Sequence, residues 1–170
     1  LVDFGVGNTT RRRIDVIGNL LFGGVWTDAT DTVTPAPRRG PKTVVFADSF
    51  GEGTGNEVTS ALSWILYMQE ELGWDDVIAS AVGSTGLLAT GTSPKTNFRG
   101  RVVRDLANIP GVELAWIAQS INDGGQSASA IITEAGQLIQ TAKSSGYTGK
   151  WLFSSPTVNF GAGKTPVTQH

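Results

Sequence analysis

The chain has 170 residues, which is enough for one ordinary domain and a small additional segment. Hydrophobic residues make up 39% of it and charged residues 16%, which argues against a disordered chain. No apolar run reaches the roughly 18 residues of a membrane-spanning helix, and a net charge of −2 with only short basic runs argues against a nucleic-acid partner. The absence of cysteine excludes disulfides and cysteine-based zinc sites.

The two ends of the sequence suggest that it is part of something longer. The first residue is Leu1 rather than an initiator methionine, and no basic-then-apolar signal segment follows it. The only histidine is the last residue, His170. We therefore expect a fragment of a longer polypeptide or assembly.

Residues 1–40 predict β structure followed by a linker. Arg12–Val16 alternates charged and apolar residues, Leu20–Trp26 is an apolar run broken by two glycines, and Asp28–Val33 is a weaker third strand. Several prolines then indicate a stiff polar connection. Two or three strands cannot bury a core alone, so we expect either the end of a β-sandwich module or a ribbon laid against the next domain.

A change of pattern near residue 42 marks the start of the main domain, where strand and helix patterns alternate. Strands are predicted at Thr43–Ala47, Asp76–Val82, Val112–Ala118 and Lys150–Ser154. Helices are predicted at Asn56–Leu72, Arg99–Ala107 and Ser127–Lys143, the first with a capping box at Thr54–Glu57 and a stop at Gly73. This alternation predicts an α/β domain over residues 41–170, a three-layer α/β/α sandwich with a parallel sheet.

Polar, glycine-containing turns follow the first three of these strands. Ser49 follows the first strand, Gly83 the second and Asn122 the third. Because parallel strands end at the same edge of a sheet, topology alone predicts that these residues converge, at the edge where open α/β sheets bind ligands. A serine there can act as a nucleophile if a base and an oxyanion site meet it.

The residues of these turns resemble a family, the SGNH hydrolases, also called GDSL-type esterases and lipases. Ala47–Gly53 matches the family's first block, Gly-Asp-Ser-x-x-x-Gly, in all but the leading glycine, and Gly83–Thr85 matches the second. Ser120–Asp123 matches the third, Gly-x-Asn-Asp, with serine for glycine. The fourth block, Asp-x-x-His, is missing, because Val167 stands where the aspartate before His170 would be.

The resemblance implies a flavodoxin-like sheet and a set of site residues. Ser49 would be the nucleophile of an ester hydrolysis that passes through an acyl-enzyme. The main-chain N–H groups of Ser49 and Gly83 and the side-chain amide of Asn122 would form the oxyanion hole. Asp48 and Asp123 would support the turns, and no metal or organic cofactor is needed.

The resemblance also bears on the substrate and the base. By analogy with relatives that carry an N-terminal β-sandwich, the expected substrate is an O-acetyl group of a carbohydrate, with lipid or small acyl esters as alternatives. The expected location is extracellular or virion-associated. In this family the base follows one more strand. We therefore expect it beyond residue 170 or on a separate chain rather than at His170, which is expected to be a mobile terminal residue.

Several alternatives stay open at this point. Gly86 competes with Gly83 for the second oxyanion position, and the side chains of Ala47 and Ser120 are expected to narrow the site. Without Asp-x-x-His, the domain could instead be a non-catalytic carbohydrate-binding or structural module of a larger extracellular or virion assembly.

Phosphate-binding motifs fit the sequence poorly. Gly161–Thr165 resembles the end of a P-loop, but the first required glycine would fall at Val158. The glycines after the first strand fail the dinucleotide pattern, because Val58 stands in the place of the third glycine. Nucleotide binding is therefore a minor alternative.

Overall fold

The structure is a computed structural model that describes residues 26–27, 29–34, 37–53, 63–118 and 120–154. The chain divides into two units, Leu1–Pro37 and Arg38–His170. In the first unit, residues 29–30 form a turn and residues 31–34 form no strand, so the strand predicted at Asp28–Val33 is wrong for the residues described there. The other two predicted strands fall within residues 1–26, of which only Trp26 is described.

The second unit is built on a parallel sheet. Its strands are β1 (Thr43–Ala47), β2 (Val77–Ala81), β3 (Leu114–Ala118) and β4 (Lys150–Ser154), in the order β2-β1-β3-β4. Thr43 is in register with Val77 on one side and Leu114 on the other, and Leu114 is in register with Lys150. The predicted parallel sheet is confirmed, with β2 and β3 slightly shorter than expected.

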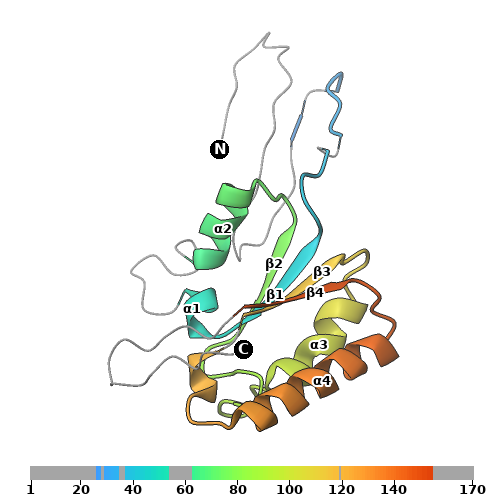
Figure 1. The fold of residues 1–170 in the computed structure, drawn as a ribbon. Coiled ribbons are helices and arrows are strands. Elements are labelled where there is room, and N and C mark those ends of the chain that lie inside the picture. The colour runs from blue at the N-terminus through green and yellow to red at the C-terminus, as the bar shows by residue number, and fades with distance from the viewer. Residues whose placement is uncertain (1–25, 28, 35–36, 54–62, 119, 155–170) are drawn as a thin grey trace. The chain divides into compact units, whose positions relative to one another are not determined.

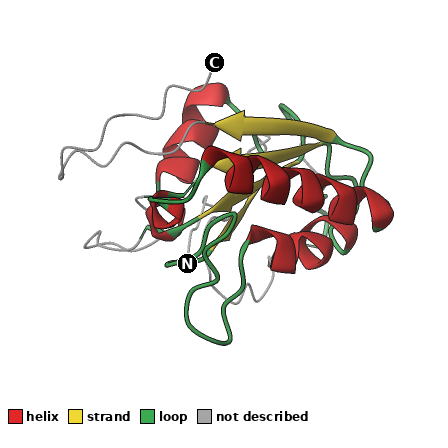
Figure 2. Ribbon diagram, turned by 60° about the horizontal axis from the view of Figure 1, so that its bottom comes forward, coloured by secondary structure: helices red, strands yellow, loops and turns green. Residues whose placement is uncertain are grey.

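Helices cover both faces of this sheet (Figure 1). They are α1 (Ser49–Glu52), α2 (Trp64–Leu72), α3 (Phe98–Ala107), the 3-10 turn η2 (Ile121–Asp123) and α4 (Ala128–Ser144). Figures 1 and 2 show α3 and α4 side by side on one face, with α1 and α2 on the other. The three-layer α/β/α prediction is thus confirmed. None of the helices in the described part of the chain is long and apolar enough to cross a membrane.

Polar side chains fix where the longer helices begin. Ser63 Oγ accepts from Ile65 N, and Ser127 Oγ accepts from Ala130 N. Ser63 has an extended backbone (φ −64°, ψ 137°), so α2 begins at Trp64 rather than at the predicted residue 56. The predicted capping box lies outside the described residues, whereas the predicted stop is confirmed by the left-handed Gly73 (φ 61°).

The central strand β1 is buried over its whole length, which explains its uninterrupted apolar run. Val44 and Phe46 point into the larger core, whose members from the helices include Phe98, Val102, Leu106 and Leu138. Val45 and Ala47 point into a smaller core that contains Ile65 of α2. The strand is therefore packed against the helices of both layers along its whole length.

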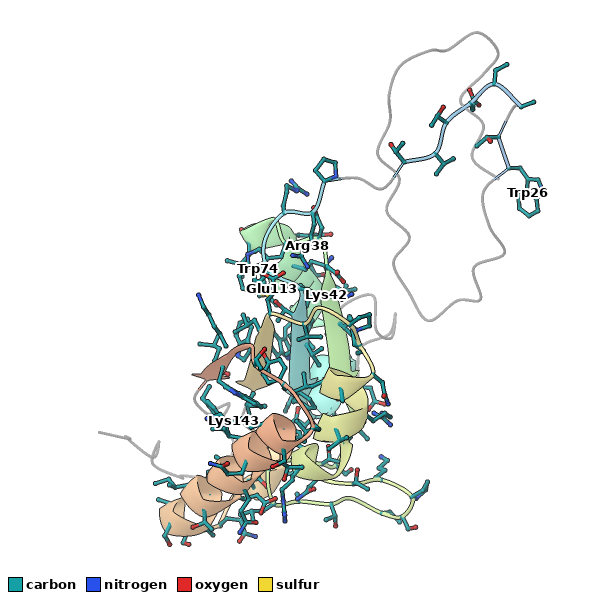
Figure 3. All side chains as sticks on the ribbon, turned by 90° about the vertical axis from the view of Figure 1, so that its right-hand side faces the viewer. Trp26, Arg38, Lys42, Trp74, Glu113 and Lys143 are labelled. Carbon is teal, nitrogen blue, oxygen red and sulfur yellow. The ribbon has the colours of Figure 1, made fainter. Side chains whose placement is uncertain are left out.

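The amino edge of the sheet lies at the opposite end from the turns of interest. Figure 3 shows Arg38, Trp74 and Glu113 close together there. The Arg38 guanidinium pairs with the Glu113 carboxylate. Gly40 has a φ of 72°, and a Cβ at this position would lie 2.3 Å from Cδ1 of Trp74. The contacts named here join residues at the amino edge, whereas the turns of interest lie at the carboxyl edge.

Candidate active site at the carboxyl edge of the sheet

Ser49 is the first residue of the short helix α1, directly after β1. Asp48 caps this helix, since its Oδ1 accepts from Phe50 N at 2.9 Å and its main-chain oxygen accepts from Glu52 N at 3.0 Å. Gly53 ends the helix with a φ of 83°. At the first helical position the Ser49 N–H has no acceptor within the helix. Sequence periodicity could not predict a helix this short and indicated a turn instead.

Gly83 lies against Ser49. A Cβ added at Gly83 would lie 3.5 Å from the Ser49 Cβ and only 2.7 Å from Oε2 of Glu52, so any side chain here would push Glu52 away. The Gly83 N–H donates to this Oε2 at 2.8 Å, and the Gly83 oxygen accepts from Lys95 Nζ at 2.9 Å. The predicted oxyanion donor therefore lies beside the predicted nucleophile and holds a carboxylate in this structure.

The competing glycine, Gly86, has a different part in the structure. Its N–H donates to the main-chain oxygen of Ala89 at 2.9 Å, within its own loop. A Cβ at Gly86 would lie 2.4 Å from Oδ2 of Asp123, so glycine is needed here to make room for that carboxylate. Of the two glycines, the geometry favours Gly83 as the oxyanion donor.

The third turn is joined to the first two by side-chain hydrogen bonds. Ser120 Oγ lies 2.7 Å from Asp48 Oδ2 and 2.8 Å from the Thr85 main-chain oxygen. Ile121 N also donates to Asp48 Oδ2, at 3.2 Å. Asn122 is exposed, and its Nδ2 donates to the same Thr85 oxygen at 3.1 Å. Because an amide nitrogen carries two hydrogens, this bond orients Asn122 and leaves a second donor for a ligand.

The residues that replace the family's glycines do not narrow the site. Ala47 and Ser120 are each 2% exposed. Ala47 lies beneath α1, where a Cβ at Gly51 would come within 2.3 Å of the Ala47 Cβ. Ser120 uses its hydroxyl to join the turns. The expectation that these side chains crowd the substrate is therefore wrong, because both lie in the interior below the site.

Asp123 fixes the loop that follows Gly86. Its carboxylate is buried, with Oδ2 accepting from Leu87 N at 2.7 Å and Oδ1 accepting from Leu88 N at 3.0 Å and Ala89 N at 2.9 Å. Three main-chain donors that would otherwise lack an acceptor are satisfied by one side chain. Asp123 thus has the supporting geometry that a turn-organising residue requires.

Replacing Asp123 by alanine is expected to lower the free energy of unfolding by about 2–3 kcal/mol, because buried N–H groups lose a charged acceptor. Asp123→Asn keeps one acceptor oxygen and should cost less than Asp123→Ala. Urea unfolding followed by tryptophan fluorescence measures both. Equal stability of the three proteins would contradict this account of the loop.

Arg101 is a buried cation beneath the site that the sequence did not reveal. Its side chain lies in the interior, and each of its guanidinium N–H groups has an acceptor. The acceptors, at 2.9–3.0 Å, are Oγ of Ser80, Oγ1 of Thr85 and the main-chain oxygens of Ala47, Ser80 and Thr96. Arg101 therefore ties the carboxyl ends of β1 and β2 to the loop of the second turn.

A carboxylate on the same helix face balances this charge. Asp105 is buried one turn after Arg101, and its Oδ2 accepts from Ser80 Oγ at 2.5 Å. Desolvation lowers the pKa of the Arg101 guanidinium to about 10, against the opposing attraction of Asp105. The side chain still carries its charge at neutral pH. A signal for this pair was present in the sequence, since both residues stand on the apolar face of α3.

The structure does not place a catalytic base. His170 lies outside the described residues, and it is the only histidine of the chain. No group of three or more histidine, aspartate or glutamate residues that could hold a metal ion occurs in the described ranges. The chemistry suggested by the described residues is thus a serine with neighbouring oxyanion donors.

Comparisons with known proteins bear on the fold. No family model and no curated protein matches the chain. A structure assigned to the G-D-S-L lipolytic family, from Desulfitobacterium hafniense DCB-2, matches with a TM-score of 0.52 and 14% identity over 68% of this chain and 59% of that one. A family two carbohydrate esterase from Clostridium thermocellum, in complex with cellohexaose, matches with a TM-score of 0.54 and 16% identity over 74% of this chain and 45% of that one.

An active-site mutant of that esterase also matches, with a TM-score of 0.52 and 17% identity over 70% of this chain and 43% of that one. The chain therefore spans only part of the length of these structures. At such low identity the likeness concerns the fold alone. The second unit of this chain has the SGNH hydrolase fold.

Proposed function

We propose that the protein is a serine ester hydrolase that acts through an acyl-Ser49 intermediate. The observation that carries the proposal is the contact of Gly83 with Ser49, at the end of the strand where the Asn122 amide is also held. Acyl transfer requires oxyanion donors near the nucleophile, and the N–H groups of Ser49 and Gly83 and the Asn122 amide are proposed to be these donors. The SGNH fold supports this assignment without deciding it.

The proposed reaction has two steps. Ser49 Oγ attacks the ester carbonyl carbon while its proton passes to a base, and the alcohol then leaves with a proton. Water attacks the acyl-enzyme in the second step and releases the acid, which regenerates the serine. The negative charge on the carbonyl oxygen would be stabilised by the N–H groups of Ser49 and Gly83 and by the Asn122 amide, each typically contributing about 2.7–4 kcal/mol.

We propose an O-acetyl group on a carbohydrate as the substrate and an extracellular or virion-associated location. Two of the similar structures are of a family two carbohydrate esterase from Clostridium thermocellum, and both were solved as cello-oligosaccharide complexes. The base is proposed to come from a segment or chain that completes the site.

A second candidate is a non-catalytic binding or structural module with the same fold. The specific observation in its favour is that the Gly83 N–H already holds the Glu52 carboxylate. A domain that catalyses no reaction has no oxyanion to stabilise, so a carboxylate bound to the Gly83 N–H would not impair its function. The two candidates differ in whether Ser49 is activated, which can be measured.

Incubation with a fluorophosphonate, followed by intact-protein mass spectrometry, tests the activation of Ser49. The wild type is expected to gain one adduct, and Ser49→Ala none. Ser144→Ala removes an exposed hydroxyl at the end of α4 and should label like the wild type. Before labelling, the wild type should release acetate from an acetylated cello-oligosaccharide, and labelling of Ser49 should abolish this release. An unlabelled wild type would overturn the esterase proposal and favour the binding module.

A further inference from the structure

The contact between Glu52 and Gly83 has no part in the proposed ester hydrolysis. Glu52 lies three positions after Ser49, so α1 places both side chains on the same helix face. Its Oε2 accepts from the Gly83 N–H at 2.8 Å, which is a normal length for such a bond. An N–H that stabilises an oxyanion must be free to turn to the substrate oxygen. In this structure, that N–H is bound to an anion of the chain itself.

The neighbouring charges hold the peptide of Gly83 in place from the other side. Lys95 Nζ donates to the Gly83 oxygen at 2.9 Å. Desolvation by burial lowers the pKa of Arg101, and the negative charge of Glu52 is the smallest of the effects that act on it, opposing this shift. Main-chain orientation at Gly83 therefore does not depend on Glu52 alone, because Lys95 and the glycine's buried position also fix it.

We propose that Glu52 is an internal occupant of the oxyanion site, which a substrate or product anion must displace from the Gly83 N–H. The inference rests on the proposed function for the meaning of that N–H, but the competition itself does not require catalysis. Glu52 is exposed, so water can reach its carboxylate when the bond to the Gly83 N–H opens. The carboxylate thus acts as a latch. It accepts the hydrogen bond of the Gly83 N–H when no ligand is bound, and it releases this N–H when a substrate or product anion binds.

A carboxylate probe tests this competition directly. Sodium acetate is titrated into nitrogen-15-labelled full-length protein, and the amide signal of Gly83 is followed by NMR. If Glu52 holds the amide about 70–90% of the time, Glu52→Ala should reach half-saturation at an acetate concentration about three- to tenfold lower than the wild type. Glu52→Gln, which keeps a weaker neutral acceptor, should lie between them.

The matched control is Glu70→Ala, which removes an exposed carboxylate from α2 and should behave like the wild type. Unchanged signals outside the site would show that each variant is folded. Half-saturation at the same acetate concentration in wild type and Glu52→Ala would overturn the proposal, as would a Gly83 signal that does not respond to acetate in Glu52→Ala.

The rate of fluorophosphonate labelling separates this inference from the proposed esterase activity. An activated serine should label about three- to tenfold faster in Glu52→Ala, because the oxyanion site is then open more of the time. A slower reaction would show that Glu52 supports the site instead of blocking it, and would overturn the latch. A wild type that never labels, with the acetate shift intact, would overturn only the esterase proposal.

Discussion

Replacing Arg101 by methionine is expected to lower the free energy of unfolding by about 3–5 kcal/mol, because it removes one partner of a buried charged network. The guanidinium donates to the main-chain oxygens that end β1 and β2, at Ala47 and Ser80. Methionine has a similar length but offers no donor. The Asp105 carboxylate would also stay buried without the cation one helical turn away.

Chemical denaturation followed by tryptophan fluorescence measures this effect. Arg104→Met is the matched control, because Arg104 stands on the same helix and contacts the same Asp105, but its side chain is 67% exposed. Its loss should cost about 1 kcal/mol or less. Similar losses in the two variants would show that the buried network around Arg101 contributes no more than a surface pair.

The same replacement is expected to disturb the candidate site. Arg101 NH1 donates to Thr85 Oγ1, and the main-chain oxygen of Thr85 accepts from both Ser120 and Asn122. Thr85 is fully buried. If its loop moved, the hydrogen bonds from Ser120 and Asn122 to its main-chain oxygen would displace the third turn as well. The site is therefore supported by a polar layer that lies between the sheet and the residues that would contact a substrate.

The sheet could be predicted because its strands carry the signals of burial. Thr43–Ala47 is a run of β-branched and aromatic residues between polar turns, and such a run is compatible with a strand that is covered on both faces. The amphipathic pattern predicted a helix at Ser127–Lys143, close to the observed α4 at Ala128–Ser144. Segments without these signals were predicted less well. The helix α1 is too short to show a helical period. The start of α2 was placed too early because the apolar pattern continues on both sides of its capping residue, Ser63.

The convergence of the three turns also followed from the sequence, because topology fixes which ends of parallel strands meet. The hydrogen bonds that hold these turns did not. In the sequence, Thr85 and Ser120 look like ordinary turn residues. They hold two turns together because they are hydrogen-bonded to each other, although they lie 35 residues apart in the chain. Arg101 and Glu52 were missed for a related reason. A charged residue is usually solvated. The position of Arg101 on the apolar face of α3 was the one sign of its burial, and nothing in the sequence indicated the contact of Glu52 with the Gly83 N–H.

Replacing Asn122 by alanine is expected to lower kcat of ester hydrolysis by about 10²–10³-fold with little change in KM, because an oxyanion donor acts mainly in the transition state. Asn122 is exposed and its described hydrogen bond is to the Thr85 main-chain oxygen, so the loss of stability should stay below about 1.5 kcal/mol. Steady-state kinetics with an acetyl ester, in the form of the protein that labels with fluorophosphonate, measure the first effect and thermal unfolding the second.

Asn122→Asp sharpens this test. The aspartate is nearly the same size, but its carboxylate offers no donor and repels the developing oxyanion, so kcat should fall at least as far as in the alanine variant. Asn108→Ala is the matched control, since Asn108 is an exposed amide at the end of α3 and should leave kcat unchanged. If the alanine and aspartate variants kept the wild-type kcat, the Asn122 amide would have no part in stabilising the oxyanion. The oxyanion formed by attack of Ser49 would then be stabilised only by the N–H groups of Ser49 and Gly83. Glu52 accepts from the second of these when no ligand is bound.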